Sequence, residues 1–224
     1  MGSGKLHHTF VPGKDPIPAE EQYHFPVDDL SAFVLAGGKS TRMGEDKAFL
    51  RVSGETLLDR ALRLAATITE NVRIVGDQKK FAAFQYPVIA DVYPDRGPLG
   101  GIHAALAFSE SDLNLVLAVD MPLLNSSWLS FLVQQSQQSA ATVTVPNAGG
   151  RFQPLCAVYR KSFAEIAEES LQAGRNKIEP LFQQVSCNAI VEKELTQAGF
   201  SLDIFRNLNT REDLEFARLA FREN

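Results

Sequence analysis

Two glycines and several basic residues follow a short apolar run early in the sequence. The run, residues 31–35, is suited to a buried parallel strand, and Gly37 and Gly38 stand directly after it. Because glycine has no Cβ, the backbone there can approach a ligand closely and present its N–H groups to an anion. Arg42 and Lys47 add positive charge to the same loop. The pattern predicts a binding site for nucleotide phosphates, with a tight turn that binds nothing as the alternative.

A carboxylate ends a second apolar run. Asp120 follows residues 115–119, and Pro122, which has no N–H to donate to a sheet, helps to end the strand beside it. A hard cation such as Mg²⁺ takes oxygen ligands and bridges them to substrate phosphates, so Asp120 is a candidate metal ligand. An aspartate that begins a turn or caps a helix is the alternative.

A third strand end carries Asp91. It follows a short apolar run, residues 88–90, and precedes a loop rich in Pro and Gly. Ligands of open α/β sheets lie beyond the carboxyl ends of the strands, where the Gly37 loop, Asp91 and Asp120 all fall. We therefore expect three separate segments to converge on one crevice, which favours metal binding by Asp120.

Short β-branched runs alternate with longer amphipathic ones along the chain. This alternation predicts a parallel sheet flanked by helices, hence an α/β fold. The predicted strands are residues 31–35, 71–75, 88–90, 115–119, 142–146 and 155–159, and the predicted helices lie within 57–68, 99–108 and 127–137. Ser162 and Thr210 are predicted helix caps, the latter together with Asp213.

The composition suits one globular domain. The chain has 224 residues, of which 45% are hydrophobic and 22% charged, and its net charge is −5. We expect a mobile tail over residues 1–29, where prolines recur without a hydrophobic period, and a single domain over residues 30–224. The negative charge argues against broad nucleic-acid binding, which needs a basic face.

The sequence shows neither a membrane segment nor paired cysteines. No apolar run approaches the roughly 20 residues that span a bilayer, and no basic start followed by an apolar stretch resembles a secretory signal. We therefore expect no membrane contact and a cytoplasmic protein. Cys156 and Cys187 lack the spacing of a disulfide framework or a zinc site, so buried thiols are predicted.

The glycine-bearing loop belongs to a longer pattern. The run at 35–47, LAGGKSTRMGEDK, resembles the signature of the molybdenum cofactor nucleotidyltransferases, in which LAGG is followed by RMG and DK. DVYPDRGPLGG at 91–101, AVDMPL at 118–123 and NLNT at 207–210 agree with the same family, so the resemblance covers about residues 32–220. It implies a three-layer α/β/α sandwich with a mostly parallel central sheet, a Rossmann-like fold of the nucleotide-diphospho-sugar transferase type. It also implies that the matching residues bind the nucleotide: Leu35, Ala36, Gly37, Gly38, Lys47, Asp91 and Asp120.

The reaction that fits these residues is nucleotidyl transfer. An anionic phosphate attacks the α-phosphorus of a nucleoside triphosphate and expels pyrophosphate, and no strong base is required because the phosphate is already ionised. The protein must align two anions and neutralise their charge. Lys47 would neutralise the triphosphate, Arg42 would assist the departing pyrophosphate, and Asp120 would hold Mg²⁺ against the α-phosphate. The sequence offers no recognisable Ser-His-Asp or Cys-His arrangement.

The resemblance also indicates the substrates. Leu35, at the first position of LAGG, is typical of the guanine-specific branch, whereas cytosine-specific relatives tend to carry Pro there, and this favours GTP. Gly76 departs from some members of that branch, which place an Asn there, so the details of base recognition stay open, with backbone groups or Asp77 as the alternatives. The implied acceptor is molybdopterin that already carries molybdenum, whose terminal phosphate would receive GMP. Candidate residues for its site are Gly100, Arg151, Arg175, Asn207 and Asn209.

Other interpretations remain open at this stage. The two asparagines could serve only as hydrogen-bonding groups at the entry to the last helix. A related enzyme could use CTP with molybdopterin, or could activate a sugar phosphate or a polyol phosphate. A nucleotide-binding regulator or a cofactor-delivery protein is the non-enzymatic alternative, against which Lys47, Asp91 and Asp120 argue. The resemblance further implies contacts with other proteins of cofactor biosynthesis or of target-enzyme maturation.

Overall fold

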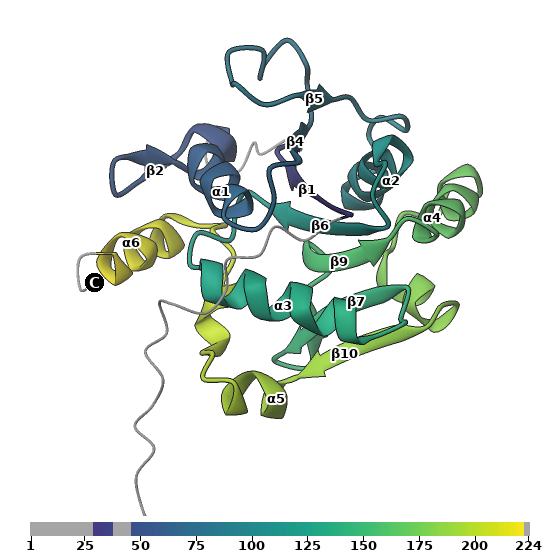
Figure 1. The fold of residues 1–224 in the computed structure, drawn as a ribbon. Coiled ribbons are helices and arrows are strands. Elements are labelled where there is room, and N and C mark those ends of the chain that lie inside the picture. The colour runs from purple at the N-terminus through teal and green to yellow at the C-terminus, as the bar shows by residue number, and fades with distance from the viewer. Residues whose placement is uncertain (1–28, 38–45, 222–224) are drawn as a thin grey trace, which may run out of the picture.

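A single large sheet forms the centre of the molecule (Figure 1). The computed structural model describes residues 29–37 and 46–221. The sheet has eight strands in the order β10-β7-β9-β6-β1-β4-β5, with β8 paired to β7. Its strands are β1 (Leu30–Leu35), β4 (Val72–Val75), β5 (Val88–Ile89), β6 (Leu113–Ala118), β7 (Val143–Ala148), β8 (Arg151–Phe152), β9 (Cys156–Arg160) and β10 (Cys187–Val191). A separate two-stranded ribbon consists of β2 (Arg51–Val52) and β3 (Glu55–Thr56).

Helices cover both faces of this sheet. They are α1 (Leu57–Ala66), α2 (Pro98–Phe108), α3 (Ser126–Gln138), α4 (Phe163–Gln172), α5 (Glu192–Gln197) and α6 (Arg211–Ala220). In β1, Ala32 and Val34 join the core under α1 and α3, whereas Phe33 and Leu35 join the core under α2 and α4. Figure 1 shows these two pairs of helices on opposite sides of the sheet. The three-layer α/β/α sandwich is therefore confirmed.

Most strand pairs of the large sheet are parallel, and two strands, β8 and β9, depart from the pattern. β1 pairs in parallel with β4 and β6, and β7 pairs in parallel with β10. β9 runs antiparallel to both of its neighbours, β6 and β7. The chain between β7 and β9, residues 149–155, is too short for the crossover that a parallel neighbour requires. A mostly parallel sheet in which β8 and β9 are reversed results.

The predicted elements lie where the structure has them, with ends shifted by one or two residues. The Thr210 cap is confirmed, because its hydroxyl accepts from the Asp213 N–H while the Asp213 carboxylate accepts from the Thr210 N–H. Ser162 does precede α4, but its side chain makes no capping hydrogen bond and its own backbone is helical. The predicted side-chain cap at Ser162 is therefore wrong.

The two thiols differ in burial. Cys156 is fully buried, and the indole Nε1–H of buried Trp128 donates to its Sγ at 3.2 Å. Burial raises the pKa of the Cys156 thiol to about 12, so this thiol is unreactive at neutral pH. Cys187 is only half-buried, which corrects the expectation of two buried thiols, and both are free.

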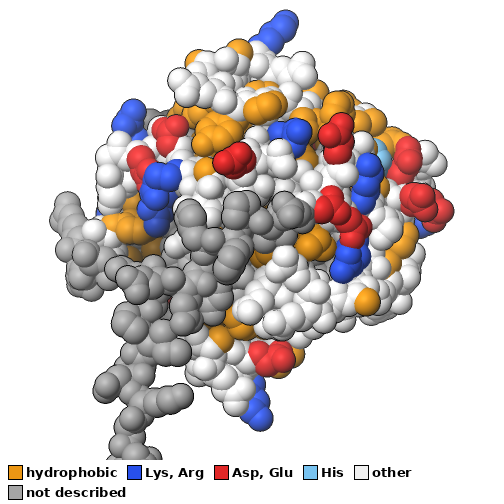
Figure 2. Space-filling view, viewed as in Figure 1, with side chains coloured by type: hydrophobic (Ala, Val, Ile, Leu, Met, Phe, Trp, Pro, Cys, Tyr) orange, Lys and Arg blue, Asp and Glu red, His pale blue; other side chains and the backbone are white. Residues whose placement is uncertain are grey.

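The amino-terminal tail predicted over residues 1–29 lies outside the described residues except for Asp29, whose carboxylate accepts from the Asp112 N–H at 2.9 Å. Among residues 29–37 and 46–221, no helix is long and apolar enough to cross a membrane. Figure 2 shows side chains of both charge signs interspersed over the described part of the face it presents.

Candidate active site

A cleft of about 990 Å³ opens at the carboxyl ends of four neighbouring strands. Strand register places these ends together, because Leu35 of β1 pairs with Val75 of β4 and with Ala118 of β6. Val75 pairs in turn with Ile89 of β5. The residues that follow these strand ends line the cleft: Ala36, Gly37, Gly76, Asp77, Asp91 and Asp120. The predicted convergence of the Gly37 loop, Asp91 and Asp120 is thus confirmed.

Lys47 contacts two oxygen acceptors from distant parts of the chain. Its Nζ donates to Oδ2 of Asp120 at 2.8 Å and to Oδ1 of Asn209 at 2.7 Å. Lys47 begins a short 3-10 helix, Lys47–Phe49, whose first turn is capped by the Asp46 carboxylate. The side chains of Lys47 and Asp120 remain 18% and 22% exposed, so the pair faces the cleft and can contact a ligand.

The segment before α6 runs along the Asp120 loop. The Leu208 N–H donates to the Asp120 carbonyl at 2.7 Å, which places Asn207 and Asn209 on either side of this bond. Asn209 reaches Lys47, whereas the Oδ1 of Asn207 is buried and has no hydrogen-bond partner among the described residues. Sequence reasoning assigned both asparagines to the acceptor site, and it did not foresee the contact of Asn209 with Lys47.

Asp91 carries an unpaired carboxylate oxygen. It follows β5, lines the cleft, and its Oδ1 is buried without a hydrogen-bond partner among the described residues. This burial raises the pKa of the Asp91 carboxyl. A Cβ built on Gly37 would lie 3.9 Å from Oδ2 of Asp91, so the glycine loop and this carboxylate are neighbours.

Asp91→Asn is expected to stabilise the protein near neutral pH. Because the folded state raises the pKa of Asp91, it binds this proton more tightly than the unfolded chain, and stability falls as pH rises above about 4 through the folded pKa. The amide removes the charge, so we expect a gain of about 1 kcal/mol in unfolding free energy at pH 7. Urea unfolding at several pH values checks this. The gain should shrink toward pH 4, and Glu110→Gln, at an exposed position, is the control.

Gly76 and Phe81 pack tightly at the floor of the cleft. A Cβ built on Gly76 would lie 2.8 Å from a ring carbon of Phe81, closer than any real contact. Phe81 is fully buried and stacks on Phe49, with ring centroids 6.0 Å apart. Position 76 therefore has no room for the asparagine that some guanine-specific relatives carry.

Alanine substitutions at two cleft glycines should separate packing from ligand contact. Gly76→Ala should cost about 1–3 kcal/mol of stability because of Phe81. In Gly37→Ala the new methyl group has only one near neighbour, Oδ2 of Asp91 at 3.9 Å, so the unfolding free energy should change by less than about 0.5 kcal/mol. Nucleotide affinity should fall about tenfold, because the methyl group enters the cleft. Chemical denaturation and calorimetric GTP titration measure the two effects. Equal stability losses would contradict the difference in packing, and Phe81→Leu should partly restore Gly76→Ala.

The described lining of the cleft is acidic. Three lysines and five aspartates line it, namely Lys47, Lys79, Lys80, Asp46, Asp77, Asp91, Asp95 and Asp120. Lys80 is already paired with Asp46, and the Asp77 carboxylate accepts from two backbone N–H groups. A polyphosphate bound here needs additional positive charge.

A divalent cation of the Mg²⁺ type fits this donor set. Among the described residues no three His, Cys, Asp or Glu side chains form a metal-binding group. Mg²⁺ commonly binds one or two carboxylates and completes its shell with water and substrate phosphates, so it does not need such a group. Asp120, which lines the cleft, and the unpaired Asp91 oxygen supply carboxylates of the required kind.

Several predicted residues do not line the cleft. Gly38 and Arg42 lie outside the described residues, whereas Leu35, Ala36, Gly37 and Lys47 line it together with Asp91 and Asp120. Gly100 is packed under the Tyr93 carbonyl, where a Cβ would approach to 3.0 Å. Arg151 in β8 and Arg175 after α4 are exposed and are absent from the lining. Their part in an acceptor site stays a prediction.

Sequence reasoning named Asp77 only as an alternative contact to the base, and it missed two lysines of the cleft, Lys79 and Lys80. Asp77, Lys79 and Lys80 follow β4 and line the wall that continues to Phe81. The signal was their position after a predicted strand at the same sheet edge as Gly37, together with two adjacent lysines. Asp77 shows how this wall is built, because its bonds to the backbone N–H groups of Lys80 and Lys79 lower the pKa of its carboxyl.

The sheet, its strand-end cleft and the Lys47–Asp120 pair define a nucleotide-binding α/β protein of the nucleotidyltransferase class. CMP:2-keto-3-deoxy-manno-octonic acid synthetase, whose structure is known with CTP, is 14% identical and shares the fold with a TM-score of 0.67 over 88% of this chain and 99% of its own. Molybdopterin-guanine dinucleotide biosynthesis protein A from Archaeoglobus fulgidus is 25% identical, with a TM-score of 0.77 over 87% of this chain and 100% of its own.

Sequence comparison identifies the family within this class. The family described as MobA-like NTP transferase domain matches residues 32–187. Molybdenum cofactor guanylyltransferase from Syntrophotalea carbinolica is 33% identical over 186 residues, which cover 83% of this chain and 89% of that relative. The chain therefore belongs to the MobA-like NTP transferase family and is a nucleotidyltransferase, as its motifs predicted.

Proposed function

We propose that this protein transfers GMP from GTP to the terminal phosphate of Mo-molybdopterin, releases pyrophosphate and forms molybdopterin guanine dinucleotide. The observation that carries the proposal is the contact of Lys47 with Asp120 in the cleft beside Gly37, in a chain whose relatives are named as molybdenum cofactor guanylyltransferases. A terminal phosphate oxygen of the acceptor forms the new bond to the α-phosphorus of GTP, and the bond to the bridging oxygen of pyrophosphate breaks.

Lys47 is the central cation of this proposal. A lysine ammonium has three donors, of which Asp120 and Asn209 occupy two. The third makes no hydrogen bond to a described residue and would bind a triphosphate oxygen, while the two acceptors hold the ammonium in place. Charge that develops on the departing pyrophosphate is stabilised without a proton transfer, because the attacking phosphate is already ionised. Arg42, outside the described residues, is proposed to assist the same leaving group.

We propose Mg²⁺ as the divalent cation and Asp120 as its protein ligand. Asp120 would hold Mg²⁺, and the cation would supply positive charge that the acidic lining lacks. Asp120 is held at the strand end by the Leu208 N–H, so its carboxylate is oriented before substrate arrives. Gly37 and Ala36 line the same cleft, where their backbone can approach the nucleotide.

The nucleotide is proposed to be GTP, on the basis of Leu35 and the named relatives. Because Phe81 fills the space beside Gly76, no side chain at position 76 can contact the nucleoside. Contacts to the base must come from other groups of the wall, among them the exposed residues 77–80. We also propose a cytoplasmic location, in keeping with the free thiols of Cys156 and Cys187.

The decisive experiment offers the purified protein Mo-molybdopterin and Mg²⁺ with either GTP or CTP, and measures pyrophosphate release. Preference for GTP supports the proposal. Preference for CTP retains the chemistry and overturns the base assignment. A parallel assay replaces the acceptor with a polyol phosphate. Turnover with that acceptor alone would assign the protein to a different transferase reaction, and no release with any combination would favour a regulatory or delivery role.

A further inference from the structure

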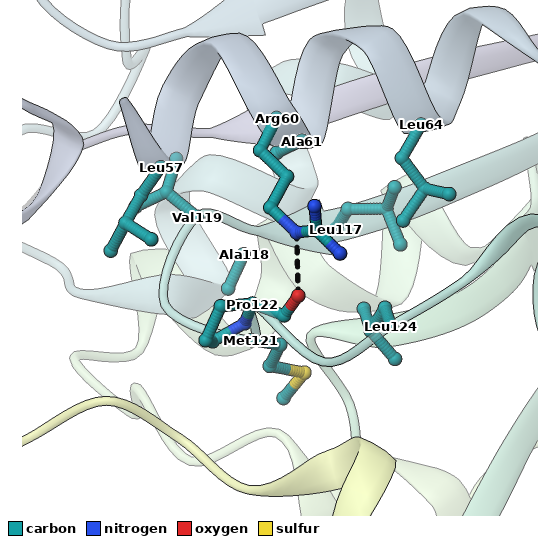
Figure 3. A pocket seen from close by; sticks show the side chains of 10 residues that line it. All are labelled: Leu57, Arg60, Ala61, Leu64, Leu117, Ala118, Val119, Met121, Pro122 and Leu124. Carbon is teal, nitrogen blue, oxygen red and sulfur yellow. Dashed lines mark hydrogen bonds between the residues drawn. The ribbon is translucent and has the colours of Figure 1, made fainter. Parts of the chain in front are cut away.

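Arg60 joins α1 to the loop that carries Asp120. Figure 3 shows its side chain extending from α1 toward Pro122, across a space lined by apolar side chains. The Nε–H of Arg60 donates to the Pro122 carbonyl at 2.6 Å. The enclosed volume beside this bond is only about 10 Å³, so at most about one water molecule fits there. The contact is direct and tightly packed.

The guanidinium of Arg60 is fixed on its other sides as well. One terminal nitrogen donates to Oε1 of Glu55 at 3.2 Å, and the Cζ lies 4.1 Å from the ring centroid of Phe221. Burial lowers the pKa of Arg60, although its pairing with Glu55 opposes this effect. Removing a charged group from water costs free energy, and the hydrogen bonds of the Arg60 guanidinium offset this desolvation.

The Asp120 loop is held by its carbonyl groups on both sides of Met121. The Leu208 N–H holds the Asp120 carbonyl at 2.7 Å, and Arg60 holds the Pro122 carbonyl at 2.6 Å. Met121 is 6% exposed and packs into the core between them. These contacts fix the backbone from which the Asp120 carboxylate reaches Lys47.

We propose that Arg60 is a positioning residue, which acts through the Pro122 carbonyl to hold Asp120 in the geometry that binds the metal–nucleotide complex. This inference rests on the proposed function. Arg60 lies outside the cleft, and its role resembles that of residues that hydrogen-bond to metal ligands and orient them. Loss of such a residue commonly lowers metal affinity or activity by 10- to 100-fold. A small displacement of the carboxylate is enough for such an effect.

The chain offers a matched control. Arg63 lies on the same helix and also pairs with Glu55, at 2.6 Å, but its side chain is 60% exposed, and its hydrogen bonds to described residues go to Glu55 and not to the Asp120 loop. Arg60→Met and Arg63→Met therefore remove the same charge and one Glu55 partner each. Only the first removes the bond to Pro122. Arg60→Lys keeps the charge, and Phe221→Leu leaves Arg60 in place but removes the ring stacked on it.

The test measures Mn²⁺ binding by electron paramagnetic resonance in the presence of a non-hydrolysable GTP analogue, and pyrophosphate release in the complete reaction. For Arg60→Met we expect about tenfold weaker Mn²⁺ binding and about tenfold lower kcat, with KM for the acceptor within twofold of wild type. Arg60→Lys and Phe221→Leu should give smaller losses in the same direction, and Arg63→Met should stay within twofold on all measures.

Wild-type Mn²⁺ affinity and kcat in folded Arg60→Met overturn the inference. If Arg60→Met does not fold, wild-type values in both Arg60→Lys and Phe221→Leu overturn it instead. Equal losses in Arg60→Met and Arg63→Met also overturn it, because the losses would then come from the removed positive charge and not from the bond to Pro122. Failure of the proposed function can be told apart from failure of this inference. If the proposed function is wrong, the wild-type protein releases no pyrophosphate, and the comparison of Mn²⁺ binding between wild type and the variants still tests the role of Arg60. Absence of Mn²⁺–nucleotide binding in wild type overturns both.

Discussion

Lys47→Met is expected to lower the rate of pyrophosphate release by about 10²- to 10³-fold. A single preorganised donor to a developing negative charge is typically worth this factor. Methionine keeps the length and the apolar stem of lysine but provides no donor for a phosphate, for Asp120 or for Asn209. The loss should fall mainly on kcat, because we place the lysine against charge that is greatest in the transition state.

The fold should tolerate this substitution. Lys47 and Asp120 form a partly exposed pair, 18% and 22% exposed, and such pairs contribute about 1 kcal/mol or less to stability. Steady-state kinetics and urea unfolding of the same preparation separate the two effects. Lys161→Met is the matched control, because Lys161 is exposed and lies at the opposite end of β6, where its N–H bonds to Asp112. Turnover within tenfold of wild type in Lys47→Met would remove the lysine from the proposed mechanism.

Local sequence patterns were sufficient for the elements that build this site. The apolar runs around 31–35 and 115–119 each end at a residue that enters the cleft, because a run of buried residues must stop where the strand leaves the core. The edge of the sheet that carries the site could be predicted without the strand order, since ligand sites of open α/β sheets lie at the carboxyl ends of the strands. The family signature then indicated Asp91 and Asp120 by position.

Contacts between distant segments could not be predicted in this way. Asn209 reaches Lys47 only because the Leu208 N–H bonds to the Asp120 carbonyl, and no spacing in the sequence encodes that bond. The crowding of Gly76 by Phe81 likewise depends on how the chain after β4 folds back over the strand end. Arg60 looked like an ordinary polar residue of an amphipathic helix, because its acceptor lies in a loop far along the chain.

The antiparallel course of β9 was missed for a related reason. Its continuous run of buried residues identifies a strand but does not give its direction. Direction follows from the connection, and the connection over residues 149–155 is too short for a parallel neighbour. Gly149 and Gly150, both with positive φ, make the tight turn that brings β8 back onto β7 and reverses the chain.

Asp120→Asn should be as damaging as the loss of Lys47, with a different dependence on metal. The amide is nearly isosteric and can still accept a hydrogen bond from Lys47, so the geometry at Nζ should survive. It carries no charge and is a poor ligand for a hard cation. We therefore expect turnover to fall about 10²- to 10³-fold and the Mg²⁺ concentration for half-maximal rate to rise at least about tenfold.

Two comparisons test this assignment. Asp91→Asn removes the other carboxylate that the cleft offers to the cation, so an equal shift in Mg²⁺ dependence would show that the cation depends on both carboxylates and not on Asp120 alone. The double variant Lys47→Met/Asp120→Asn should be little worse than either single one, because residues that act as a unit are not additive. Losses that multiply would instead mean that Lys47 and Asp120 act independently, and the 2.8 Å contact between them would then be incidental to catalysis.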